Sequence, residues 1–229
     1  MHVRRRGPVV AVALVAVALV AVVLVAPSAS AGGNGGAGRE VAKRALLQLT
    51  DLPAGWVEQP PTAMSPSGIK ACRAIEAVVK RNKRLRVSSP DFERQPASSA
   101  QNSVYAFPTL ARSKGFFRTF TGVGAQTCFQ MTVEQAVLGS QPDAQITART
   151  FDETSFDTGG IADDVVGIEF VIAVPDASGG VATYVTAVAV RVGRFFDGFT
   201  FQHTSAALPE APGLVLASLT RLEAPVGAG

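Results

Sequence analysis

The stretch VVGIEFVIAV, residues 165–174, decides the fold. Apolar side chains occupy all of its even-numbered positions, namely Val166, Ile168, Phe170, Ile172 and Val174. A period of two is typical of a β-strand, in which alternate side chains share one face. The turn-forming segment DASGG, residues 176–180, follows at once, so the sequence predicts a strand that ends in a hairpin loop.

Two further strands are predicted after this hairpin, over residues 181–192 and 195–203, with Gly193 and Arg194 as the turn between them. The three strands form an antiparallel meander. Residues 144–152 are expected to add a fourth strand, and residues 102–107 read as another. Both faces of the 181–192 strand are largely apolar, so we expect helices to cover parts of both sides of the sheet.

Other segments repeat their apolar residues at helical spacing, which predicts helices over residues 40–50, 71–82, 110–120 and 211–222. Pro53 stops the first helix, because the residue before a proline resists helical dihedral angles. Gly115 weakens the third. Patterning is continuous over residues 39–223, so we expect a single α+β domain in which helices pack on an antiparallel sheet, followed by a tail at residues 224–229.

The N-terminus has the pattern of a secretory signal peptide over residues 1–31. Three arginines, Arg4 to Arg6, precede an apolar run that ends at Ala26, and Ala29-Ser30-Ala31 offers a cleavage site after Ala31. Residues 32–38, GGNGGAG, are expected to form a flexible linker. The run of about eighteen apolar residues is at the lower limit for spanning a bilayer, so an uncleaved membrane anchor is the alternative. The protein is expected to be secreted or held in the extracytoplasmic cell envelope.

The apparent basicity of the chain comes from this segment. The full chain has 21 Lys and Arg residues against 18 Asp and Glu residues, and removal of the three arginines leaves 18 against 18. A near-neutral mature chain lacks the net positive charge that binding to phosphate backbones requires. Nucleic acid is therefore not an expected partner.

Two cysteines, Cys72 and Cys128, are expected to form a disulfide, because an exported chain folds in an oxidising compartment. Closing a loop of about 57 residues stabilises the folded state by roughly 4 kcal/mol in the chain-entropy model. Two buried thiols are the alternative. The spacing excludes a CxxC metal or redox site.

Catalytic signatures are weak throughout the chain. His203 is the single histidine after residue 31, which excludes zinc sites built on paired histidines, and no Gly-x-Ser-x-Gly elbow is present. A hydrolase using His203 with Asp197 or Ser205 is a remote alternative to a sheet-end histidine. The tripeptide Asp157-Thr158-Gly159 has no second copy, which an aspartic protease needs. We expect no enzyme, no cofactor and no metal site.

Two charged stretches have opposite signs. Residues 143–176 contain eight acids against Arg149, and they lack the ligand order of an EF-hand, so a solvated loop is preferred to a calcium site. Residues 70–86 contain seven bases against Glu76. This stretch is either a solvated helix face, partly neutralised by the acidic loop, or a contact for an anionic surface. The residues of that contact would be Lys70, Arg73, Lys80, Arg81 and Arg84.

The segment DLPAGW, residues 51–56, is the most distinctive short motif. Asp51, Pro53, Gly55 and Trp56 are expected to form a structural corner, because proline ends a helix, glycine tolerates a positive φ and tryptophan inserts a large apolar group. Stacking of Trp56 on a ligand is the alternative.

The longer segment LLQLTDLPAGW, residues 46–56, resembles the opening of a family of actinobacterial secreted sensor-like domains. This family includes extracellular domains of some mycobacterial receptor serine/threonine kinases and related exported proteins and lipoproteins. Further agreement comes from the two cysteines, from Tyr105-Ala106-Phe107 with Phe116-Phe117, from VAVRVGR at residues 188–194 and from the closing helix. The likeness spans most of residues 40–222. It implies an α+β domain with an antiparallel sheet and a ligand-binding cleft, without known catalysis.

These observations predict an exported, non-catalytic domain that binds a small apolar or amphipathic ligand between sheet and helices. The alternative is an envelope module that binds a protein partner. Membrane contact is expected through an uncleaved signal helix, if at all. A deep apolar cleft favours the first function, and a flat exposed apolar patch favours the second.

Overall fold

The computed structural model describes residues 35–60, 69–95, 97–152, 158–175, 180–204 and 206–223. The predicted signal peptide, residues 32–34 of the predicted linker and the tail at residues 224–229 lie outside the described residues. The same holds for residues 153–157 of the acidic stretch, for most of the predicted hairpin loop at residues 176–179, and for Ser205.

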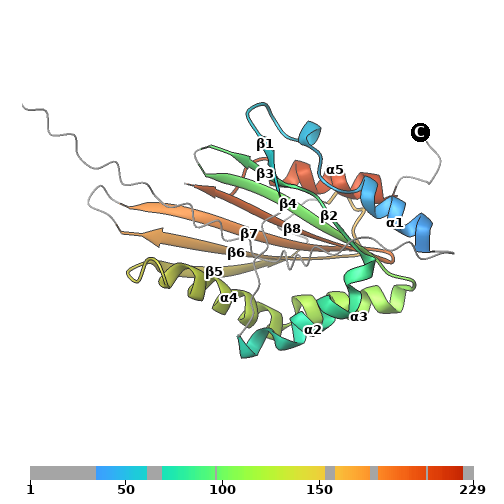
Figure 1. The fold of residues 1–229 in the computed structure, drawn as a ribbon, viewed down its shortest axis with the longest axis horizontal. Helices are drawn as coiled ribbons and strands as arrows, with labels where there is room; N and C mark the ends of the chain where they lie inside the picture. Colours follow the sequence, from blue (N-terminus) through green and yellow to red (C-terminus); the bar gives the residue numbers. More distant parts are fainter. Residues whose placement is uncertain are drawn as a thin grey trace, which may run out of the picture.

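Within the described residues, eight strands form one antiparallel sheet (Figure 1). The order across the sheet is β1-β3-β4-β8-β7-β6-β5, and β2 also pairs with β4. The strands are β1 (Val57–Gln59), β2 (Arg86–Ser88), β3 (Asp91–Arg94), β4 (Ser98–Ala106), β5 (Gln145–Asp152), β6 (Asp164–Val174), β7 (Val181–Val192) and β8 (Phe195–Thr204). The predicted α+β fold with an antiparallel sheet is confirmed.

The expected meander is formed by β6, β7 and β8, which pair in chain order. Val174 pairs with Val181 at the first hairpin, and Val192 pairs with Phe195 across the predicted turn. Gly193 in that turn has a φ of 54°, which glycine adopts readily. The predicted fourth strand is confirmed as β5, which pairs with β6 at the edge of the sheet.

Helices cover both faces of the sheet, as expected (Figure 1). On one face lie α1 (Gly35–Arg44) and α5 (Ala211–Glu223). On the other lie α2 (Arg73–Asn82), α3 (Leu110–Thr121) and α4 (Val123–Leu138). Three short 3-10 turns complete the described helical elements: η1 (Leu49–Asp51), η2 (Lys70–Cys72) and η3 (Lys83–Leu85).

Strand β7 shows why two helical layers are needed. Val188 and Val190 point into the core beneath α1 and α5, whereas Val185 and Ala187 point into the core beneath α4. Because successive side chains of a strand point to opposite faces, a strand that is apolar throughout exposes hydrophobic surface unless both faces are covered. The sheet is therefore the central layer of three.

The first helix differs from its prediction. It spans Gly35–Arg44, so it begins within the expected linker and ends well before residue 50. Its end has a tertiary cause: the side-chain oxygen of Asn102 accepts a hydrogen bond from the Leu47 N–H at 2.9 Å, and its amide nitrogen donates to the Ala45 carbonyl at 3.2 Å. Leu49, one of the apolar residues of the predicted helix over residues 40–50, is 41 % exposed.

Helix α4 and the strands β1, β2 and β3 were not predicted. The apolar residues of α4 do not form one stripe, since Val133 and Val137 are buried while Val123, Met131 and Leu138 are exposed. A helix without a one-sided pattern escapes detection by periodicity. The three strands have three or four residues each, too few to show a period of two, and β4 begins at Ser98 rather than at residue 102.

Candidate functional site

A narrow cleft lies between the sheet and helices α3 and α4, and small residues form its floor. Ala187 and Ala189 of β7 face this side of the sheet, and Ala189 lies directly opposite Gly198 of β8. These residues carry a methyl group or no side chain at all. They leave space beneath the helices that larger side chains would fill.

The walls of the cleft are formed mostly by apolar side chains. Phe120 of α3 and Phe129 of α4 face each other with ring centroids 5.5 Å apart, and Val166 and Ile168 of β6 close the side toward the sheet edge. The cleft has a volume of about 30 Å³, whereas one water molecule needs roughly 10–15 Å³ on the same measure. The cleft thus accepts a small apolar group with its present side-chain positions.

An aromatic cluster holds the α3 wall in place, and Phe196 of β8 lies at its centre. The Phe196 ring meets Phe116 edge-on at 4.8 Å and Phe120 edge-on at 5.1 Å between centroids. Edge-to-face pairs of this kind add about 0.5–1.5 kcal/mol to the burial of each ring. Phe116 and Phe117 are both buried.

Two polar side chains lie at the junction of α3 and α4. The Thr121 hydroxyl donates to the Phe117 carbonyl at 2.8 Å, and the Gln126 amide nitrogen donates to the Thr121 carbonyl at 3.3 Å. None of the described residues that line the cleft is charged. Because an unpaired charge is costly to bury, the cleft suits the uncharged part of a ligand, with polar groups at Thr121 and Gln126.

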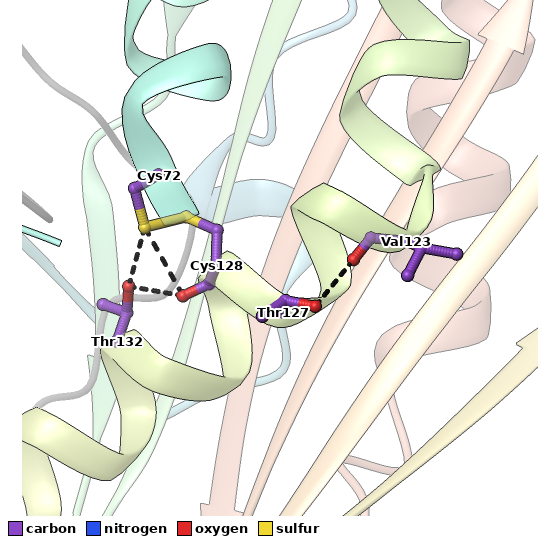
Figure 2. Close-up of a disulfide and its surroundings, with 5 residues drawn as sticks. All are labelled: Cys72, Val123, Thr127, Cys128 and Thr132. Atoms are coloured by element: carbon purple, nitrogen blue, oxygen red, sulfur yellow. Dashed lines mark hydrogen bonds between the residues drawn. A yellow bond between two sulfur atoms is a disulfide. The ribbon is translucent and has the colours of Figure 1, made fainter. Parts of the chain in front are cut away.

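The disulfide between Cys72 and Cys128 joins η2 to α4 (Figure 2). It confirms the predicted pairing and excludes the alternative of two free thiols, since no free cysteine is present. The Thr132 hydroxyl donates to the Cys128 carbonyl at 2.8 Å on the same helix (Figure 2). The bridge fixes α4 to the α2 side of its layer.

The predicted corner is held by contacts of its own. Gly55 has a φ of 96°, and Trp56 is buried in the core beneath α1 and α5 with the Arg94 guanidinium 4.9 Å from its ring centroid. Both carboxylate oxygens of Asp51 accept hydrogen bonds from Arg221 of α5, at 3.0 and 2.8 Å. A buried ring that is covered by an arginine leaves no open face for a ligand. The structural interpretation of the corner is therefore favoured over ligand stacking.

A buried polar cluster lies beneath α1 and α5, and the sequence did not predict that its residues come together. Asp197 of β8, Asn102 of β4 and Ser218 of α5 are each at most 1 % exposed. Burial raises the pKa of Asp197 from 3.8 to about 8, against the lowering effect of its hydrogen bonds with Ser218 and Asn102 and of the Arg221 charge. The available sequence signal was a polar residue at an apolar position, since Asp197 shares its strand face with Phe199 and Phe201.

His203 does not meet the acid that the hydrolase alternative required. Asp197 lies six residues away on the same strand, a separation of about 20 Å. The Nδ1 atom of His203 is instead 2.8 Å from the Ser98 hydroxyl, which the sequence did not suggest, and neither residue lines the cleft. Thr158 and Gly159 are the described part of the Asp-Thr-Gly tripeptide, and Asp157 lies outside the described residues.

The acidic stretch is not simply a solvated loop. Glu169 is buried within β6 and pairs with Arg149 of β5 at 2.8 Å. Asp163 and Asp164 both bind the buried Arg191 of β7. These acids stabilise the sheet, so they do not neutralise the basic helix as expected. The described residues contain no group of three or more His, Cys, Asp or Glu side chains placed to hold a metal ion.

The bases of the predicted anionic-surface contact lie on one helical segment. Lys70, Arg73, Lys80, Arg81 and Arg84 are all exposed, whereas Ile75 and Val79 on the opposite side of the helix are buried. No described residue forms an ion pair with any of these bases. They remain candidates for an external anionic partner.

Exposed apolar residues are dispersed over the described surface. On α4, Val123, Met131 and Leu138 are separated by polar residues such as Thr127 and Glu134. This arrangement lacks the contiguous apolar area by which a protein-binding patch is recognised. In the part of the chain that the structure describes, no helix is both long enough and apolar enough to cross a membrane.

The sequence matches no protein-family model, and no curated protein matches it. The fold and the cleft define a single α+β domain with an apolar cleft between its sheet and one helical layer. The resemblance to secreted sensor-like domains stays a prediction.

Proposed function

We propose that this chain is an exported, non-catalytic domain that binds a small apolar or amphipathic ligand in the cleft beneath α3 and α4. The observation that carries this proposal is the floor of Ala187, Ala189 and Gly198 under two aromatic walls. Small residues in the middle of a sheet bury less apolar surface area than larger ones, and an apolar ligand that fills the space adds to the buried area. The resemblance to sensor-like domains supports the same function.

The cleft can widen where α3 meets α4. Gly122 breaks the helical run between the two helices, and its backbone N–H still donates to the Arg118 carbonyl at 3.0 Å. A larger ligand enters by rotation of the Phe120 and Phe129 side chains, since the volume of the cleft is about 30 Å³. The disulfide keeps α4 attached to η2 while this happens.

The lining also constrains the chemistry of the ligand. Its buried part is uncharged and largely hydrocarbon, because the described lining residues carry no charge. A hydroxyl, ester or amide group is placed at Thr121 and Gln126, where hydrogen-bonding side chains are available. A slender amphiphile, with one linear or small-ring apolar part, satisfies both conditions.

A fluorescence titration with cis-parinaric acid, a linear polyene dye that brightens when its chain leaves water, tests the site. We expect saturable binding by the wild-type protein and at least a tenfold weaker affinity for Ala189→Val, because the added methyl groups fill the cleft floor. Overpacking a filled site costs about 1–3 kcal/mol, which covers that factor. Equal affinity in both proteins would refute the cleft as the binding site.

Ala148→Val is the matched control. Ala148 lies on the edge strand β5, is exposed and does not line the cleft. Valine is well tolerated in strands, so this variant is expected to bind the dye like the wild type. Native mass spectrometry of the exported protein, compared with the same sample after denaturation, then tests for a copurified ligand. The denatured mass also identifies the first residue of the mature chain. A bare mass in all preparations argues against a resident ligand.

A further inference from the structure

Charge pairing is strongly uneven across the described residues. The bases of the ion pairs lie on α1, β3, β5, β7 and α5, where each has a carboxylate within 3.0 Å: Lys43, Arg94, Arg149, Arg191 and Arg221. By contrast, six exposed bases on η2, α2 and η3 form no ion pair with any described residue: Lys70, Arg73, Lys80, Arg81, Lys83 and Arg84. We call these six, together with three exposed bases of α3, the α2–α3 basic surface.

Helix α3 enlarges the surface that the sequence suggested. It contributes Arg112, Lys114 and Arg118, all exposed, and it lies beside α2 in the same layer (Figure 1). Glu76 is the one acid within η2, α2, η3 and α3, and it is half-buried. Since the chain after residue 31 has equal numbers of acidic and basic residues, this excess of positive charge is local. The excess makes the charge distribution of the molecule asymmetric without giving it a net charge.

One feature of the layer favours a bilayer over a soluble polyanion. Leu110 and Val123, at the first positions of α3 and α4, are 48 % and 78 % exposed, so aliphatic side chains accompany the bases. A surface with both cations and aliphatic groups matches the headgroup region of an anionic membrane.

We propose that the α2–α3 basic surface docks the protein onto an anionic phospholipid bilayer. The phosphate groups of the lipids meet the unpaired lysines and arginines, and Leu110 and Val123 enter the headgroup region. Each base near an anionic surface increases membrane partitioning about fivefold. Docking through this layer is independent of the cleft and does not require a bound ligand.

Cosedimentation with vesicles tests the proposal with the exported form of the chain. Vesicles of phosphatidylglycerol and phosphatidylcholine are compared with vesicles of phosphatidylcholine alone, which measure any contribution of a retained apolar N-terminal segment. We expect binding to the anionic vesicles at 50 mM salt and its loss at 0.5 M salt, where charges are screened within a few ångströms. Equal partitioning into both kinds of vesicle, or no binding to either, overturns the proposal.

Variants locate the surface. Lys80→Gln is expected to weaken binding about fivefold, and Lys80→Gln with Arg81→Gln about 25-fold. Lys43→Gln, which removes the same charge from an exposed position on α1, is the control and should bind like the wild type. Wild-type binding by the double variant overturns the proposal. So does retention on immobilised polyglutamate under conditions that leave the anionic vesicles unbound. Thermal unfolding of each variant confirms that the fold is kept.

Discussion

The hydrogen bonds around Asp197 lead to a specific prediction of how the free energy of unfolding depends on pH. The Ser218 hydroxyl oxygen lies 2.6 Å from the Ala45 carbonyl and 2.6 Å from the Asp197 carboxyl group. A hydroxyl has one proton, and a carbonyl can only accept. Both contacts are satisfied when Asp197 is protonated and donates to Ser218, which donates to Ala45. Asn102 completes the arrangement by donating to the other Asp197 oxygen at 3.1 Å.

The magnitude follows from the pKa of Asp197, which burial raises from 3.8 to about 8. Between these two pH values the folded state keeps a proton that the unfolded state has lost. The free energy of unfolding therefore falls as pH rises, by about 1.4 kcal/mol per pH unit. The contribution is fully present below pH 3.8 and has been lost once the pH passes about 8. Between pH 5 and pH 7 the loss amounts to about 3 kcal/mol.

Replacing Asp197 by Asn removes this dependence. The asparagine amide can donate to Ser218 and its oxygen can accept from Asn102, but it has no proton to lose in this range. Urea unfolding at pH 5, 6 and 7, followed by the fluorescence of Trp56, the single tryptophan, gives both free energies. We expect the wild type to lose about 3 kcal/mol more than Asp197→Asn over this range.

Other titrating groups are common to both proteins, so their effects cancel in this comparison. Ser218→Ala is the control, because it destabilises the buried cluster while it keeps the carboxyl group. Its unfolding free energy should retain the wild-type slope with pH. Parallel profiles for the wild type and Asp197→Asn would refute a protonated Asp197 in the folded state.

Further changes should affect stability in directions that the structure defines. Cys72→Ala with Cys128→Ala should lower the free energy of unfolding by about 4 kcal/mol, the value for opening a loop of this length, and an unchanged urea midpoint would contradict it. Gly55→Ala should destabilise by about 1–2 kcal/mol, because its φ is 96°. Gly115→Ala, inside α3 with no atom within 4 Å of the added methyl group, should stabilise by up to about 1 kcal/mol; equal thermal shifts for the two glycine variants would refute this reasoning.

The meander could be predicted because local pattern and tertiary burial agree there. In β6 the even-numbered residues Ile168, Phe170 and Ile172 are buried beneath α4, so the apolar period of the sequence coincides with one face of the strand. The end of α1 could not be predicted, because Asn102, far along the chain, takes the hydrogen bond of Leu47. Helix α4 was hidden because its exposed side carries Val123 and Met131. Long-range contacts and exposed apolar residues leave no local signal.

The candidate site was predictable in kind and not in its residues. A cleft between sheet and helices was expected, but its floor depends on Ala189 and Gly198 lying opposite each other across two strands. The predicted turn at Gly193 and Arg194 sets this register, but the sequence does not specify which helices cover the face on which Ala189 lies. The disulfide was predictable because the expected export signal predicts an oxidising compartment and two cysteines leave one pairing. The basic residues of α3 were overlooked because their clustering with α2 appears only in three dimensions.

The two faces of the sheet are secured by different chemistry, which gives the fold two separate weak points. The α1 and α5 face depends on a proton held by Asp197, while the opposite face depends on a covalent bond between Cys72 and Cys128. A rise in pH toward 8 acts on the first, and a reducing agent acts on the second. Amide hydrogen exchange should resolve them, with protection lost from α5 in one case and from α4 in the other. Each layer can therefore loosen while its neighbour across the sheet stays ordered.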